Sequence, residues 1–259
     1  MSLATPLSQL PPSGELGYNF LLIRCYHGNN MKIITFNYTV EKDLQNYENN
    51  FLQQNYPDYG IKGFDTAPAL WPSIKEQIVV AEEDKKREIV KQHLDDFSKN
   101  SLSVSIEKEG LEKYWATMEV KYFKRLCEYM NIKESVTGIT AYFTTLSISP
   151  YSVPNRYFYI SIFSSLPRQI KNILHESMHI IFRTEYDGHM TEKGLNKQAI
   201  LEITEALVVL LNWEFKDFLL MPENNNKPST LDLQEEVVKL WKNKENFSVI
   251  LDKLIDMRK

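Results

Sequence analysis

The sequence NILHESMHIIFR, residues 172–183, constrains the fold more than any other stretch of this chain. Apolar residues such as Ile173 and Leu174 cover most sides of a helix here, so the helix is expected to be buried. Two histidines lie four residues apart within it, and residues at i and i+4 share one face of a helix. His175 and His179 therefore point the same way into the interior, where imidazoles without partners are costly. A neighbouring element must supply a partner for them.

A metal ion is the partner that this spacing suits. Imidazole nitrogens one helical turn apart can both reach a zinc ion at about 2.0–2.1 Å. Glu176 directly follows the first histidine and lies about 100° around the helix from it. That is the position of a general base that takes a proton from a metal-activated water. The pattern His-Glu-x-x-His thus gives each defined residue a chemical role. The alternative is a core helix in which hydrogen bonds, and not a metal ion, pair the two histidines.

A catalytic zinc usually has three protein ligands, so a third ligand must come from elsewhere in the chain. The segment KQAILEITEALVVLLNW, residues 197–213, is expected to form a helix. Its main polar residues fall within roughly 80° of one another and form one stripe, which on most helices faces solvent. These residues are Gln198, Glu202, Glu205 and Asn212. A glutamate from this stripe would complete the metal site, and the residue pattern leaves Glu202 and Glu205 both open.

With these motifs the chain resembles the zincin metallopeptidases, and specifically the gluzincin branch that includes thermolysin-like enzymes and zinc aminopeptidases. In that branch, a helix that gives a glutamate ligand follows the His-Glu-x-x-His helix after about twenty residues. The resemblance implies that His175 and His179 bind Zn²⁺ and that Glu176 is the catalytic base. It also implies that Glu205 is the third ligand, with Glu202 as the alternative. Glu205 is favoured because a small residue, alanine, follows it, as is frequent in the family.

The chain departs from the family in two respects. After His179, 22 residues intervene before Glu202 and 25 before Glu205, which is slightly more than in the best-known members. The acidic residue that thermolysin-like enzymes place four after the ligand is also missing, since Val209 and Ala206 stand at those positions. The carboxylate that would orient a ligand histidine is therefore unassigned.

Other assignments around the motif are weaker. The three-histidine zincin class needs a glycine and a histidine where Phe182 and Glu185 stand. His189 remains a lesser candidate for a ligand or a transition-state donor. Four tyrosines could stabilise an oxyanion, and the sequence does not separate them: Tyr142, Tyr151, Tyr159 and Tyr186.

The remaining sequence predicts an α+β fold. The resemblance implies a zincin-like arrangement, in which a small mixed sheet with a strand hairpin packs on the metal-binding helix and a helical C-terminal lobe follows. An edge strand of the hairpin would hold an extended peptide. Strands are expected at 32–39, and at 139–148 and 156–164 as the hairpin. Helices are expected at 40–54, 72–100, 108–131, 165–182 and 197–218, with a polar connection at 183–196 and two amphipathic helices after residue 230.

The chain divides into three regions by its amino-acid composition and motifs. Residues 1–30 are rich in proline, serine and glycine at first and are expected to be a poorly ordered extension. Residues 31–135 form a mixed strand and helix region without a recognisable motif. The resemblance implies that residues 136–259 form the zincin-like catalytic region.

Composition excludes several classes of partner. The formal net charge of −4 provides no positive field for nucleic acid or an anionic membrane. No apolar run approaches the roughly 18 residues that a membrane-spanning helix needs. The two cysteines, Cys25 and Cys127, lack a metal-ligand spacing, which fits a reducing cytoplasm.

The sequence therefore predicts zinc-dependent hydrolysis of a peptide or protein substrate, by a metal-activated water with Glu176 as general base. One alternative is a catalytically silent metal-binding or interaction protein that keeps the zincin fold. Another is a helical scaffold in which the motif is accidental. Substrate-binding residues and oligomeric state are not indicated by the sequence.

Overall fold

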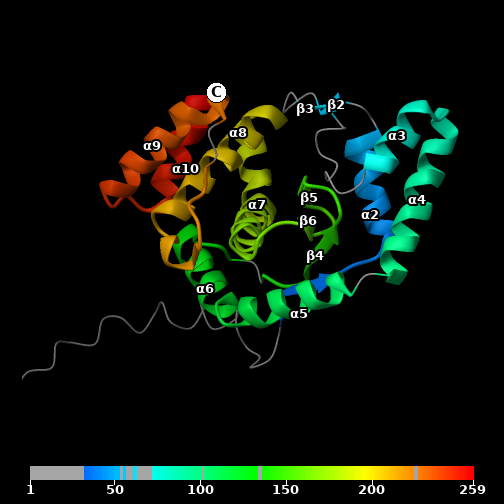
Figure 1. Cartoon of the computed structure of the whole chain (residues 1–259). Helices are drawn as coiled ribbons and strands as arrows, with labels where there is room; N and C mark the ends of the chain where they lie inside the picture. Colours follow the sequence, from blue (N-terminus) through cyan, green and yellow to red (C-terminus); the bar gives the residue numbers. More distant parts are fainter. Residues whose placement is uncertain are drawn as a thin grey trace, which may run out of the picture. The chain divides into compact units, whose positions relative to one another are not determined.

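The computed structural model describes residues 32–52, 55–56, 61–62, 72–100, 102–133, 136–224 and 227–259. The predicted extension at 1–30 lies outside these residues. Residues 32–259 form one compact unit with the α+β fold that was predicted, in which helices surround a small mixed sheet (Figure 1). Strand β1 (Ile34–Asn37) and helix α2 (Val40–Asn46), from the first half of the chain, contact strand β4 (Ile139–Thr144) in the second half. The two halves thus share one core.

The sheet has four strands in the order β1-β4-β6-β5. In β1 the residues alternate between buried and exposed, which directs Ile34 and Phe36 to the core. Strand β4 is the parallel neighbour of both β1 and β6, while β5 pairs antiparallel with β6 at the edge of the sheet. The strands are β1 (Ile34–Asn37), β4 (Ile139–Thr144), β5 (Tyr151–Ser152) and β6 (Tyr157–Ser161).

The predicted hairpin between 139–148 and 156–164 is wrong, because β4 and β6 run parallel. Parallel neighbours need a connection that crosses over, and residues 145–156 provide it. Within this connection β5 returns along the edge and forms the real hairpin with β6, where Tyr151 faces Phe158. The tight turn is closed by a hydrogen bond from the Arg156 backbone N–H to the Val153 carbonyl at 3.2 Å.

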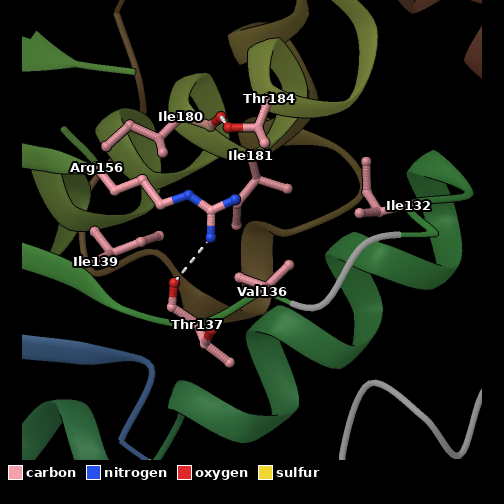
Figure 2. Close-up of a pocket in the computed structure, with 8 residues that line it drawn as sticks. All are labelled: Ile132, Val136, Thr137, Ile139, Arg156, Ile180, Ile181 and Thr184. Atoms are coloured by element: carbon pink, nitrogen blue, oxygen red, sulfur yellow. Dashed lines mark hydrogen bonds between the residues drawn. The ribbon is translucent and has the colours of Figure 1, made fainter. Parts of the chain in front are cut away.

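Arg156 fixes the start of β6 through both its backbone and its side chain. Its φ of 47° is left-handed, as the turn before β6 requires. The guanidinium lies in a small, mainly apolar pocket against α7 and donates to the Thr137 carbonyl at 3.1 Å (Figure 2). The pocket walls include Ile139, Ile180 and Ile181. The arginine thereby ties the turn before β6 to the segment that precedes β4.

Helix α7 (Leu166–Glu192) packs against β6 and carries the two histidines. The predicted polar connection at 183–196 is wrong, because the helix continues to Glu192. Several of its polar side chains bond within the helix itself: Arg183 pairs with Asp187 at 2.8 Å, and the Thr184 hydroxyl donates to the Ile180 carbonyl at 2.7 Å. The helix stops before Gly194, whose φ of +91° favours glycine.

Both long helices predicted in the N-terminal half are divided in two. Near Thr117, the side-chain hydroxyl donates to the Tyr114 carbonyl, which competes with continuation of the helix. A second small sheet joins β2 (Asn55–Tyr56) and β3 (Ile61–Lys62). The helices are α2 (Val40–Asn46), a π-helical continuation (Tyr47–Leu52), α3 (Pro72–Val80), α4 (Glu83–Asn100), α5 (Ser103–Ala116) and α6 (Glu119–Met130).

After α7 the described secondary-structure elements are all helical, and the two predicted closing helices are confirmed. Helix α8 packs on both α7 and α9, which places the C-terminal helices on the side of α7 away from the sheet (Figure 1). In the described residues, none of the helices has the length and apolar character needed to cross a membrane. These elements are α8 (Lys197–Leu207), 3₁₀ turns at Val208–Asn212, Lys216–Phe218 and Pro228–Thr230, α9 (Leu231–Lys242) and α10 (Phe247–Arg258).

Helix α2 anchors the end of β4 through a buried carboxylate. Asp43 accepts hydrogen bonds from the Thr144 hydroxyl at 2.6 Å and from the Thr145 hydroxyl and backbone N–H at 2.9 and 3.1 Å. Asn46 donates to Thr144 and to the Ile148 carbonyl at 2.9 and 3.4 Å. These bonds fix the segment after β4, which leads to the edge strand β5.

Burial of Asp43 raises its pKa from 3.8 to about 6, although the bonds from Thr144 and Thr145 oppose the shift. The folded protein therefore holds this proton more tightly than the unfolded chain, and the contribution to stability is lost as pH rises from about 4 to 6. We expect the free energy of unfolding of wild type, relative to Asp43→Asn, to fall by on the order of 2–3 kcal/mol between pH 4 and pH 7. Urea denaturation with chelator present would measure it.

The matched control is Asp252→Asn, at an exposed position on α10. The difference in the free energy of unfolding between Asp252→Asn and wild type should stay constant over the same pH range. A constant difference for Asp43→Asn as well would contradict the assignment of the pH dependence to Asp43.

Candidate metal centre

Three of the predicted residues come together at one point. His175, His179 and Glu205 each offer a ligand atom, and these atoms all lie within 4.8 Å of one another. The two Nε2 atoms are 2.9 Å apart, and Nε2 of His179 is 3.7 Å from Oε1 of Glu205. Two ligands of one tetrahedral zinc at about 2.0–2.1 Å are separated by roughly 3.3 Å. These two separations lie on either side of that value, so the three side chains are close enough together to hold a metal ion.

The protons of the two imidazoles also fit a metal. Burial lowers the pKa of His175, but Glu176 and Glu223 outweigh it and raise the pKa overall. Burial and the charge of His175 lower the pKa of His179 well below its usual value. The two Nε2 atoms face each other at 2.9 Å, and the buried Nδ1 of His179 has no hydrogen-bond partner among the described residues. A cation bound between the two Nε2 atoms would leave Nδ1–H on each ring.

The structure separates the two glutamates that the sequence left open. The Glu205 side chain is 6% exposed and faces α7. His179, His175 and Lys227 more than offset the effect of burial and lower its pKa to about 2, so it is ionised as a ligand must be. The Glu202 carboxylate instead accepts hydrogen bonds from the Arg258 guanidinium at 2.7 Å and from the Gln198 side-chain amide at 2.9 Å. Glu205 is therefore the residue in position to ligate, and Glu202 ties α8 to the C-terminal helix.

Glu176 lies in the same cleft as the cluster, directly after His175. Burial raises the pKa of its carboxyl to about 8, with Glu205 and Glu223 adding to the shift and His175 opposing it. Such a carboxyl accepts and returns a proton near neutral pH more readily than an exposed glutamate.

Glu223 is a functional candidate that the sequence did not reveal. Its Oε2 accepts from Nδ1 of His175 at 3.2 Å, and its other oxygen lies 3.6 Å from Nζ of Lys171. Asn212 holds the Glu223 backbone with two hydrogen bonds of 2.7 and 2.8 Å. Glu223 thus orients His175, as carboxylates commonly orient metal-binding histidines. The residue belongs to the low-complexity segment ENNNKPST, where nothing local marks one acidic residue as special.

Replacing Glu223 with alanine should weaken zinc binding by about 10- to 100-fold, because His175 loses the acceptor that fixes its ring and tautomer. Asn212→Ala should have a smaller effect in the same direction, since it frees the backbone of Glu223. Competition with a chromophoric zinc chelator would measure both affinities. Glu245→Ala, at an exposed position after α9, serves as control. Unchanged zinc affinity in Glu223→Ala would refute the orienting role.

The cleft around the cluster has a volume of ≈ 370 Å³, large enough for part of a peptide. Helix α7 forms its floor. One wall is the segment Ser147–Tyr151, which leads into edge strand β5, and the other includes Glu223 and Lys227. Lys227 donates to Oε1 of Glu205 at 2.9 Å and is a second site residue that the sequence did not reveal.

Tyr151 is the one of the four candidate tyrosines that lines this cleft. Its ring centre is 5.0 Å from that of His179, and its hydroxyl is buried. Burial raises the pKa of the Tyr151 hydroxyl, and the nearby Arg183 opposes this shift in part. The hydroxyls of Tyr159 and Tyr186 donate to backbone carbonyls, and Tyr142 contacts other tyrosine rings on the sheet.

His189 takes no part in the described cluster. It lies in the last turn of α7, not in a connecting loop. Ten residues of helix separate it from His179, which corresponds to roughly 15 Å along the axis. It is therefore too far away to complete the coordination.

Comparison with known proteins gives no relative of this chain: no family model, no curated protein and no solved structure matches it.

Proposed function

We propose that this protein is a zinc-dependent peptidase of the gluzincin type. The observation that carries the proposal is the convergence of His175, His179 and Glu205 in an open cleft that also holds Glu176. A site that only binds metal for stability has no need of a fourth, ionisable carboxyl with a raised pKa beside the ligands.

The arrangement of the chain supports the same family. The metal-binding helix packs on a mixed sheet, and a glutamate comes from the next helix. Edge strand β5 pairs only with β6 in the described sheet, so its outer edge offers backbone groups to an extended peptide. Such a peptide would pass over α7 between the two walls of the cleft.

A bound zinc ion would supply a positive charge that makes water acidic near neutral pH and polarises a substrate carbonyl. His175, His179 and Glu205 would hold it, with Glu223 orienting His175. The Glu176 carboxylate takes a proton from the attacking water and returns it to the nitrogen that leaves. Tyr151 lines the cleft with its ring beside His179, and it is our candidate to donate a hydrogen bond to the carbonyl oxygen.

The substrate class that we propose is peptides or proteins, and the low cysteine content supports a reducing compartment such as the cytoplasm. Cys127 is a buried thiol on α6, which agrees with that setting. The acidic composition leaves nucleic acid and anionic membranes out of the proposal.

Two measurements test the proposal. Protein purified with zinc supplementation should contain about one equivalent of zinc, and less than about a tenth of an equivalent would contradict the metal site. The loaded protein should cut members of a peptide pool, as detected by mass spectrometry. Treatment with a chelator should stop the cleavage and added zinc should restore it. Zinc binding without any cleavage would favour the alternative, a catalytically silent metal-binding protein.

A further inference from the structure

Arg168 lies at one end of the cleft that holds the metal ligands. It lines this cleft together with Asn172, His175 and His179. These residues are spaced by four, three and four positions along α7, so they share one face of the helix. Arg168 precedes His175 by seven residues, which corresponds to roughly 10 Å along the helix axis.

The charge of Arg168 has no carboxylate partner within the described residues, although the side chain is exposed to the cleft. The other cations near the ligands are paired, Lys171 with Glu223 and Lys227 with Glu205. Arg168 is also the third residue of α7, and a cation in the first turn opposes the helix dipole. Helix stability therefore does not account for an arginine at this position.

The space between Arg168 and the metal ligands is lined by groups suited to an extended chain. Asn172 donates to the Ser149 hydroxyl at 3.2 Å and so ties the β5 wall to α7 midway between Arg168 and His175. A peptide that follows this wall advances about 3.3–3.6 Å per residue. The distance from the ligands to Arg168 is thus about three residues of substrate.

We infer that Arg168 binds a carboxylate of the substrate, two or three residues from the bond that is cut. This inference rests on the proposed peptidase function and names its substrate preference. The planar guanidinium can hold a carboxylate with two parallel hydrogen bonds. The carboxylate can be the C-terminal group of a short peptide or the side chain of an aspartate or glutamate. Arg168 is therefore a residue that determines specificity and not a catalytic residue.

The test uses the peptide that is cut fastest in the pool, synthesised in matched forms. One pair has a free or an amidated C-terminus, and a second pair has aspartate or asparagine at the third residue from the cut. Arg168→Gln should lower kcat/KM for one acidic form by about 10- to 100-fold, the loss expected for a charge-assisted hydrogen bond. The neutral forms should change by less than about twofold. If the peptide with a free C-terminus loses its higher kcat/KM, Arg168 binds the C-terminal carboxylate. If the peptide with aspartate loses it, Arg168 binds the side-chain carboxylate.

Binding provides a second readout that does not need turnover. Calorimetric titration of zinc-loaded Glu176→Gln protein with the same peptides should show tighter binding of one acidic form, and this preference should vanish when Arg168→Gln is added. Lys193→Gln, at the other end of α7, is the matched control and should change nothing.

The outcomes separate the two hypotheses. Cleavage by wild type with equal losses for acidic and neutral forms in Arg168→Gln, or with no loss, overturns the role of Arg168 and leaves the peptidase intact. The wild-type protein could instead cut no peptide of the pool and still bind acidic peptides more tightly than neutral ones, with a preference that depends on Arg168. That result would overturn the proposed peptidase function and support Arg168 as a carboxylate-binding residue.

Discussion

Replacing Glu176 with glutamine should reduce peptide hydrolysis by about 100- to 10,000-fold while zinc remains bound. Glutamine has nearly the same size and can still accept a hydrogen bond, but it does not take up a proton. The side chain is not needed to hold the metal, because His175, His179 and Glu205 are the residues whose ligand atoms come together. Turnover and zinc content should therefore respond differently to this substitution.

The measurement is single-turnover hydrolysis of a pool peptide, with zinc content determined on the same sample. Glu185→Gln is a suitable control, since Glu185 lies on the same helix outside the cleft. Turnover retained in Glu176→Gln would exclude the general-base role. Loss of zinc together with turnover would show instead that Glu176 contributes to coordination.

The second large effect concerns the third ligand. Glu205→Gln should weaken zinc binding by at least about 100-fold, because one of three protein ligands loses its charge. Glu202→Gln should leave zinc affinity unchanged. It should instead lower the free energy of unfolding by about 1–3 kcal/mol, because Glu202 is the partly buried partner of Arg258.

Lys227→Met completes this comparison. Lys227 pairs with Glu205 at 2.9 Å, so any effect of Glu205→Gln that came only from breaking this ion pair should recur in Lys227→Met. We expect zinc binding to persist in that variant. Zinc loss in Glu202→Gln, or zinc retained in Glu205→Gln, would contradict the ligand set.

Local periodicity was sufficient to predict the part of the site that lies on one helix. The i, i+4 spacing places His175 and His179 on the same face whatever surrounds the helix, and Glu176 follows from its position in the chain. The end of that helix was mispredicted, because Arg183, Thr184 and Asp187 were taken for loop residues. Their hydrogen bonds are made inside the helix, which a count of polar residues does not reveal.

Strand pairing was the main error in the fold. The β-branched and aromatic residues of 139–148 and 156–164 predicted two strands, but such a composition contains no information on the relative direction of the strands. Their parallel pairing depends on β5, a strand of two residues, returning along the edge. Such a short strand is fixed by the contacts of its neighbours and not by a pattern of its own.

The sequence by itself determined the α+β class and the common helix face of the histidine pair with its adjacent glutamate, and it led us to expect a carboxylate from a second helix. Only the tertiary structure decided that Glu205 faces the histidines while Glu202 faces Arg258, since residues three apart on a helix differ by only about 60° in direction. It also brought Glu223 to His175 across 48 residues. The physical reason is that helical geometry acts within a few residues, whereas the orientation of one helix toward another depends on packing throughout the core.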